Sequence, residues 1–221
     1  MKKIFTTLFV AAMAFASMAE GRSWNFVLSA DNADSQAIQA SSLWTEGSKG
    51  RWTNTNAITD AQLMIDETTP LACTAGLYFT ADASKILMGC TNNYYLQTNG
   101  NVTIRIPECA AGDSLILGIS SSSSSKNYTI TFTNAEAESY TTEGSSKTTF
   151  QTVVPAAGDV ILTCASGIRF FTMEVVTTED TTTAIEEVEN APKSAVAYDL
   201  FGRVSDSKGF KVANGKVILV K

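Results

Sequence analysis

Two tryptophans, an arginine and a pair of tyrosines are the residues of this sequence best suited to bind a ligand. They are Trp44, Arg51, Trp52, Tyr94 and Tyr95. Sugar rings present apolar CH faces that stack on tryptophan and tyrosine, while an arginine can donate hydrogen bonds to hydroxyl groups or pair with uronate carboxylates. Burial in a core is the commoner position for large aromatic residues. Both interpretations of these five residues therefore stay open.

The sequence contains no histidine. This excludes Ser-His-Asp and Cys-His nucleophilic sites, histidine general bases and histidine-ligated metals. Asp60, Asp66 and Glu67 could supply a carboxylate pair for glycoside hydrolysis, but the sequence does not give the separation that defines such a pair. We expect these three to be surface charges and the protein to be non-catalytic. A polysaccharide lyase or hydrolase that uses carboxylates is the remaining enzymatic alternative.

Oxygen donors cluster at Asp31, Asn32 and Asp34, where they could contribute to a structural calcium site. Calcium takes about six to eight oxygen ligands, and this segment lacks the glycine and the distal glutamate of an EF-hand loop. A solvated turn is the favoured interpretation, and we expect no cofactor.

Four cysteines, Cys73, Cys90, Cys109 and Cys164, lie outside any C-x-x-C pair. An even number of cysteines in an exported protein permits two disulfides with three connectivities. Three of the four adjoin apolar strand patterns, so buried free thiols are the alternative. A domain of this length can form a core without disulfides.

The first 19 residues have the pattern of a signal peptide. Lys2 and Lys3 precede an uncharged apolar run over residues 4–16, and Ser17 and Ala19 have the small-residue spacing that a signal peptidase recognises. We expect cleavage after Ala19, because the run is shorter than the roughly 20 residues that a membrane span requires. No later segment is long and apolar enough to cross a membrane.

The charge balance indicates which partners are excluded. The chain has 16 basic and 22 acidic residues, so removal of Lys2 and Lys3 leaves 14 basic residues and a formal charge of −8. Nucleic acids and anionic membranes favour clustered lysine and arginine. We therefore expect an acidic, exported protein that binds no nucleic acid and has no membrane span after cleavage.

Alternating apolar and polar residues with turn signals between them predict an all-β fold. The expected strands cover residues 23–29, 62–65, 76–80, 86–89, 94–97, 102–107, 114–119, 128–132, 148–154, 158–164 and 168–175. The polar stretch between residues 31 and 52 is expected to be a long surface loop, and the serine run 120–125 a solvated hairpin loop. Strands at this spacing predict a jelly-roll-like two-sheet β-sandwich over residues 20–176.

The stretch from Gly158 to Val175 contains the strongest strand pattern. Its two apolar strands are expected to form a hairpin, with Ser166 and Gly167 in the turn because glycine accepts the positive φ of short loops. Apolar residues occur on both faces of the second strand. That pattern predicts a central strand covered on both sides.

The chain after the sandwich changes in composition. A polar, acidic linker covers residues 177–183, and a small β-domain is expected over residues 184–221. Its short strands would cover residues 198–200, 209–212 and 216–220, with a hairpin turn at Asn214 and Gly215. About 40 residues are too few for a deep core.

This tail resembles the C-terminal sorting domain of bacterial proteins exported by the type IX secretion system. The matching motif includes Tyr198, Asp199, Leu200, Gly202, Arg203, Lys208, Gly209, Asn214, Gly215 and Lys216. The resemblance implies recognition by that secretion machinery and delivery through the outer membrane. The protein would then be released or attached to the cell surface.

The sandwich region resembles the accessory β-sandwich found beside pectate lyases and other polysaccharide-degrading enzymes. The matching segments are Trp24 to Phe26, the strand from Val102 to Pro107, Ala111 to Asp113, Gly158 to Val160 and Gly167 to Phe171. The resemblance implies a non-catalytic domain that binds a polysaccharide or surface glycan, including polyuronates. The alternative is a structural or adhesive surface protein that binds other proteins.

Overall fold

The computed structural model describes residues 21–91, 94–177, 209–213 and 216–220. The chain divides into two compact units, Met1–Thr178 and Glu179–Lys221. The predicted signal peptide, all but the first residue of the linker, and the motif residues from Tyr198 to Lys208 together with Asn214 and Gly215 lie outside the described residues. Within the described part of the chain, no helix is long and apolar enough to cross a membrane.

The first unit contains two antiparallel sheets. Sheet A has eight strands, with β12-β9-β14-β7-β6-β3-β2 in that order and β1 paired to β14. Its strands are β1 (Arg22–Asn25), β2 (Trp44–Glu46), β3 (Arg51–Asn54), β6 (Ile86–Gly89), β7 (Leu96–Thr98), β9 (Ser114–Ser121), β12 (Thr148–Val153) and β14 (Ile168–Val176). Sheet B has six strands in the order β11-β10-β13-β8-β5-β4. They are β4 (Ile58–Ala61), β5 (Tyr78–Ala81), β8 (Val102–Cys109), β10 (Thr129–Thr133), β11 (Ser139–Thr141) and β13 (Gly158–Cys164).

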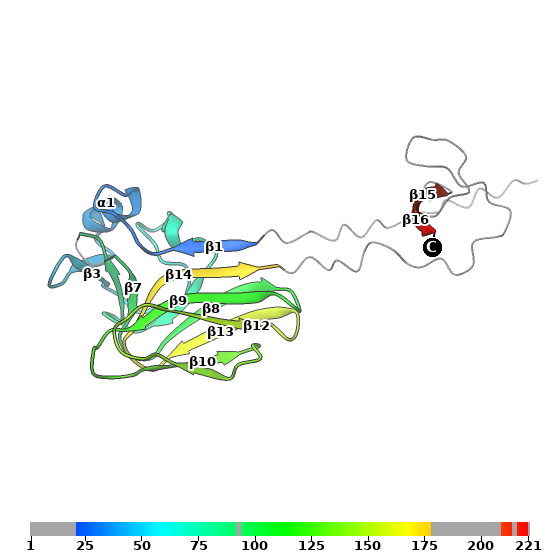
Figure 1. Ribbon diagram of the computed structural model, residues 1–221. Coiled ribbons are helices and arrows are strands. Elements are labelled where there is room, and N and C mark those ends of the chain that lie inside the picture. Colours follow the sequence, from blue (N-terminus) through cyan, green and yellow to red (C-terminus); the bar gives the residue numbers. More distant parts are fainter. Residues whose placement is uncertain (1–20, 92–93, 178–208, 214–215, 221) are drawn as a thin grey trace, which may run out of the picture. The chain divides into compact units, whose positions relative to one another are not determined.

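This arrangement confirms the all-β, two-sheet sandwich. From β8 to β14 the chain crosses repeatedly between the sheets, so most neighbours within a sheet are distant in sequence (Figure 1). The connection of sequential strands across the core is the feature expected of a jelly-roll-like fold.

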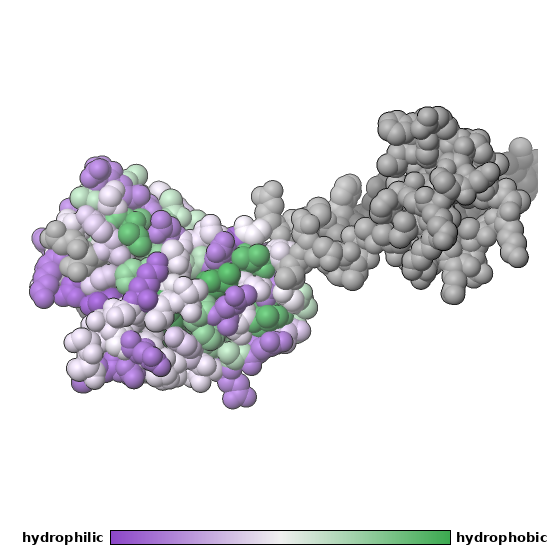
Figure 2. Space-filling view, in the orientation of Figure 1, coloured by the Kyte–Doolittle hydropathy of each residue, from purple (hydrophilic) through white to green (hydrophobic). Residues whose placement is uncertain are grey.

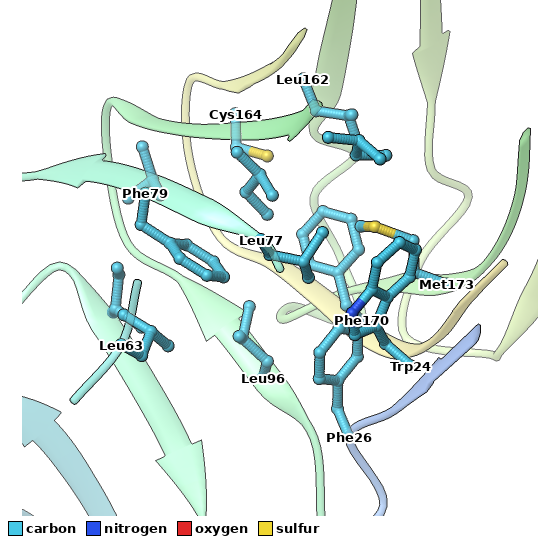
Figure 3. Packing of buried hydrophobic residues seen from close by; sticks show 14 of the residues in the cluster. Trp24, Phe26, Leu63, Leu77, Phe79, Leu96, Leu162, Cys164, Phe170 and Met173 are labelled. Atoms are coloured by element: carbon cyan, nitrogen blue, oxygen red, sulfur yellow. The ribbon is translucent and has the colours of Figure 1, made fainter. Parts of the chain in front are cut away.

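The core lies between the sheets and follows from the alternation of apolar residues. In β8, Val102, Ile104 and Ile106 point inward and are almost fully buried, while the residues between them are partly exposed. Phe170 and Met173 of β14 pack in the same core beside Trp24 and other apolar residues (Figure 3). Trp24 is itself buried, at 7% exposed.

A β-bulge in β14 corrects the predicted faces of that strand. The register with β9 shifts between Phe170 and Thr172, so Phe171 is an extra residue. Phe170 and Met173 can therefore both point inward, although strict alternation would place them on opposite faces. Strict alternation would instead place Phe171 on the same face as Met173. The bulge instead explains why apolar residues seemed to occupy both faces.

The predicted hairpin between residues 158 and 175 is wrong. β13 pairs with β8 and β10 in sheet B, whereas β14 pairs with β9, β7 and β1 in sheet A. The connection crosses the core, and Gly167 does not have a positive φ. A glycine is needed there because a Cβ atom would lie 2.1 Å from Oγ of Ser122.

Several local predictions also differ from the structure. The polar stretch contains α1 (Ala33–Ala40), a helix too short to show a sustained period in the sequence, and Asn32 caps its N-terminus. Residues 62–65 contribute only an isolated bridge, between Met64 and Pro70, while β4 precedes them. β8 continues past Pro107 to Cys109, and β11 was not predicted.

The serine run is only partly a loop. Ser120 and Ser121 belong to β9 and are fully buried, and the loop begins after them. Oγ of Ser121 donates a hydrogen bond to the carbonyl oxygen of Lys126 at 2.6 Å. The first two serines of this run therefore belong to the sheet and not to a solvated loop.

In the second unit, β15 (Gly209–Ala213) and β16 (Lys216–Val220) form an antiparallel pair. These two strands were predicted, and the predicted turn between them, Asn214 and Gly215, lies outside the described residues. The third expected strand, residues 198–200, lies outside the described residues.

Asp34 should be essential for stability because its carboxylate links α1 to the 3-10 helix η1 (Ala72–Thr74). It accepts hydrogen bonds from the N–H groups of Ala72 at 3.1 Å and Cys73 at 2.6 Å. Asp34→Ala leaves both donors unpaired in a partly buried position, and we expect a loss of about 1 to 3 kcal/mol in the free energy of unfolding. Urea unfolding measures it. Asp31→Ala, at an exposed neighbouring position, is the control, and equal stability of the two variants would contradict the prediction.

Candidate functional site

The outer face of sheet A brings together an aromatic pair and several cations. Because side chains alternate, the neighbours of inward-facing Leu96 and Phe170 point away from the core. These neighbours are Tyr95, Gln97, Arg169 and Phe171, together with Arg51 of β3 and Lys147 beside β12. Gly89 separates Arg51 from Tyr95, since it pairs with Arg51 and its N–H donates to the carbonyl oxygen of Tyr95 at 3.0 Å.

Arg169 is held in one position at the centre of this face. Its guanidinium carbon lies 4.7 Å from the ring centroid of Tyr95. Its Nε donates to Oε1 of Gln97 at 3.2 Å, and its Nη2 donates to the carbonyl oxygen of Ser122 at 3.1 Å. Gln97 is in turn oriented by a 2.6 Å bond to Oδ1 of Asn99. No described residue accepts a hydrogen bond from Nη1 of Arg169.

Lys147 provides a second cation over an aromatic ring. Its Nζ lies 5.4 Å from the ring centroid of Phe171, which meets Tyr95 edge-on at 6.1 Å and 80°. The bulge in β14 is the reason that Phe171 reaches this face. Gly118 leaves room for Lys147 and Thr172, because a Cβ atom there would lie 3.1 Å from Cε of Lys147 and 2.3 Å from Oγ1 of Thr172.

The cations of this face have no carboxylate partner among the described residues. Both ion pairs of the described chain involve Arg105 of sheet B, with Asp60 at 2.8 Å and Asp159 at 3.0 Å. Glu174 is exposed further along β14 and forms no ion pair with a described residue. The outer face of sheet A thus carries three cations without a carboxylate partner among the described residues, distributed from Lys147 beside β12 to Arg51 of β3.

The five residues predicted to bind a ligand do not form one site. Only Arg51 and Tyr95 lie on the outer face of sheet A, and Tyr95 is only 5% exposed because Arg169 covers it. Trp44 is buried, with its indole N–H bonded to the carbonyl oxygen of Met64 at 2.9 Å. Trp52 pairs with inward-facing Met88 and packs against the core.

Tyr94, the fifth residue, is half-buried, and its hydroxyl donates to the carbonyl oxygen of Thr91 at 2.7 Å. The sequence analysis missed Gln97, Lys147, Arg169 and Phe171. A signal existed for Arg169, since it is a cation within an otherwise apolar strand. Nothing in the sequence distinguished Lys147 from other surface lysines.

Of the three carboxylates considered for hydrolysis, Asp60 and Asp66 are hydrogen-bonded within the protein and Glu67 is exposed. Arg105 bonds both oxygens of Asp60 and stacks 4.2 Å from the ring centroid of Tyr78. The N–H of Glu108 and the guanidinium of Arg105 lower the pKa of Asp159. Hydrogen bonds from Thr68 and Thr69 lower the pKa of Asp66. A general acid requires a raised pKa, so neither Asp66 nor Asp159 is suited to that role.

Of the three oxygen donors considered for calcium, Asn32 and Asp34 are hydrogen-bonded within the protein, and Asp31 is exposed. Oδ1 of Asn32 accepts the N–H of Asp34, whose own oxygens bond to the N–H groups of η1. No group of three or more candidate ligands occurs among the described residues. The segment functions as a helix cap in this structure.

All four cysteines are free thiols. Burial raises the pKa of Cys90 to about 11 and that of Cys164 to about 12. Burial also raises the pKa of Cys73, aided by the negative charge of Asp34. The neutral thiols therefore act as small apolar groups, as in the second of the two alternatives.

Comparison with known proteins gives no family assignment. No family model matches the chain, and no curated protein matches it. Similar solved structures include CBM35 from Paenibacillus barcinonensis, at 12% identity over 61% of this chain and 98% of that chain, with a TM-score of 0.29. Others are BiXyn10A CBM1 in its apo form (8% identity, 71% and 97%, TM-score 0.28) and Arthrobacter globiformis T6 isomalto-dextranase complexed with panose (13%, 46% and 21%, TM-score 0.24). These TM-scores are too low to carry an argument.

The burial of Trp44 leads to a prediction about stability. Trp44→Ala should remove about 3 to 5 kcal/mol from the free energy of unfolding, because it leaves a cavity and an unpaired carbonyl oxygen at Met64. Arg51→Ala, at a partly exposed position, should change stability by less than about 0.5 kcal/mol. Chemical denaturation distinguishes the two. A Trp44→Ala variant as stable as the parent would contradict the burial of this residue.

Proposed function

We propose that this protein is a secreted or surface-attached, non-catalytic β-sandwich that binds carbohydrate. We further propose that its ligand is an acidic polysaccharide, such as a polyuronate, and that it binds on the outer face of sheet A. The observation that carries this proposal is the uncompensated guanidinium of Arg169, held between Tyr95, Gln97 and Ser122.

Arg169 is prepared to bind a carboxylate. Two of its nitrogens are committed to Gln97 and Ser122, which leaves the N–H groups of Nη1 for a ligand. A side chain already fixed by hydrogen bonds loses little conformational entropy on binding. A hydrogen bond between a guanidinium and a carboxylate is among the stronger polar contacts in proteins.

Charge complementarity favours an acidic polymer over a neutral one. The protein is acidic overall, so a polyanion is repelled by most of its surface. Arg51, Lys147 and Arg169 make the outer face of sheet A the exception. Repeated carboxylates along a polyuronate could pair with more than one of these cations.

Two features support a binding function without catalysis. The chain has no histidine, and the carboxylates Asp60 and Asp159 are paired with Arg105. General acid catalysis requires a protonated group, and the lowered pKa of Asp159 disfavours its protonated form.

The function can be tested by comparing polygalacturonate with the same polymer after methyl esterification. Esterification removes the charge and keeps the sugar backbone. We expect the full chain to bind the free acid more tightly, by isothermal titration calorimetry, and this difference to shrink as salt rises. Equal affinity for both polymers would overturn the polyuronate specificity, and failure to bind any polysaccharide on a glycan array would overturn carbohydrate binding.

Substitution of Arg169 should identify the site. Arg169→Gln removes a charge-assisted hydrogen bond, and we expect a loss of about 1.5 to 3 kcal/mol in binding free energy to the free-acid polymer. Lys126→Gln changes the net charge equally at an exposed loop position whose side chain forms no hydrogen bond with Arg169, and should have little effect. Equal losses in both variants would show that binding depends only on net charge.

The alternative function is adhesion to other proteins. Only Val27 and Val176 are large apolar residues exposed on the described chain, and Figure 2 shows that hydrophobic patches on the visible face are small. Large protein interfaces usually bury more apolar surface than this. Self-association in solution, together with silence on the glycan array, would favour this alternative.

We also propose that residues 184–221 direct export through the type IX secretion system. The proposal rests on the motif from Tyr198 to Lys216, and the β15–β16 hairpin is compatible with it. Deletion of residues 184–221 should leave the sandwich in the periplasm, as fractionation and immunoblotting would show. Normal appearance of the truncated protein outside the cell would refute the sorting role.

A further inference from the structure

A separate pocket lies between residues of β2 and β4, the outermost strands of the two sheets. Its volume is about 230 Å³. Leu43, Trp44, Ile58 and Met64 form its apolar lining, and Asn56 and Gln62 contribute polar groups. β2 ends sheet A and β4 ends sheet B, so the pocket lies at the edges of the two sheets.

The lining determines the charge of a suitable ligand. No charged side chain lines the pocket, in contrast to the outer face of sheet A. An ion would therefore enter without a partner and would lose its hydration. The pocket suits a neutral group.

Some of the polar groups are already committed to the fold. Asn54 donates to the carbonyl oxygens of Asn56 at 2.7 Å and Asp82 at 2.9 Å, and its Oδ1 accepts the N–H of Ile86. Oε1 of Gln62 accepts the N–H of Gly76 at 2.8 Å. Asn54 is thus a structural residue rather than a ligand contact.

Other polar groups remain available. Within the described residues, no hydrogen bond engages the side-chain amide of Asn56, Nε2 of Gln62 or the hydroxyl of Thr59, and all three residues line the pocket. They offer both donors and acceptors beside an apolar wall. A small ring with one apolar face and hydroxyl groups at its edge matches this combination.

We infer that this pocket binds a single neutral sugar ring, as a second site distinct from the outer face of sheet A. The choice of a sugar rather than another neutral, amphipathic ring rests on the proposed function. The volume favours one ring, because it lies below the roughly 300 to 1,000 Å³ of sites for larger ligands. The two sites together bind neutral and acidic units of a mixed polysaccharide.

The inference can be tested by titrating the full chain with neutral methyl glycosides. The indole N–H signals of the tryptophans are followed in a two-dimensional NMR spectrum. Trp44 lines the pocket, whereas Trp24 is bonded to the carbonyl oxygen of Ala75 elsewhere in the core. We expect at least one neutral glycoside to shift the Trp44 signal in a saturable, millimolar titration and to leave the Trp24 signal unchanged. Equal movement of both signals, or none for Trp44, would overturn the inference.

Two variants connect such binding to the pocket. Ala57→Trp should fill the mouth and abolish the shift, whereas Ala111→Trp, at an exposed turn outside the pocket, should not. Asn56→Ala removes the free amide but keeps the carbonyl oxygen that Asn54 uses, and should weaken binding about threefold to tenfold. Unchanged binding in both Ala57→Trp and Asn56→Ala would overturn the assignment.

These experiments also distinguish the proposed polyuronate site on the outer face of sheet A from the neutral-sugar site in the pocket. Polygalacturonate binding that is retained while no neutral glycoside moves the Trp44 signal would overturn only the second site. Neutral glycoside binding at Trp44, sensitive to Ala57→Trp but not to Arg169→Gln, would support the second site even where polygalacturonate does not bind.

Discussion

The single extra residue in β14 is the constraint on which the rest of the sandwich depends. β9 pairs with β14 along almost its whole length, but on the other edge β14 pairs with β7 before the bulge and with β1 after it. The N–H of Phe26 donates to the carbonyl oxygen of Phe171 at this change of partner. Without the bulge, either Phe170 or Met173 would face solvent, because strand side chains alternate strictly. The same residue that completes the core thus places the ring of Phe171 on the outer face.

The two sheets differ in whether the charge of a central arginine is neutralised by a carboxylate. Arg105 of β8 meets Asp60 and Asp159, and its charge is compensated within the protein. Arg169 of β14 meets an amide, a carbonyl oxygen and an aromatic ring. Arg105 therefore forms ion pairs within sheet B, whereas Arg169 leaves a positive charge without a described carboxylate partner on the outer face of sheet A. This difference, rather than the number of aromatic residues, makes the outer face of sheet A the better candidate for an acidic ligand.

Residues predicted from their type alone illustrate the limits of sequence patterns. Trp44 and Trp52 were candidates because they lie in a polar stretch, yet tertiary packing buries one and half-buries the other. Tyr95 lies on the outer face of sheet A, but Arg169 covers its ring, so the ring is not exposed for stacking on a ligand. The serine run seemed uniformly solvated, although Ser120 is buried in β9 because the strand extends into it.

The sequence by itself determined the fold class, most strand positions and which side chains of β8 point inward, because period-two alternation and turn residues act locally. It also determined the absence of histidine chemistry. Only the tertiary structure decided that β13 and β14 belong to different sheets, and that Arg169 lies over Tyr95, 74 positions away in the chain (169 − 95). Strand pairing and bulges depend on partners distant in sequence, so a local pattern carries no information about them. For the same reason, the charge on the outer face of sheet A appears only after the sheets have formed.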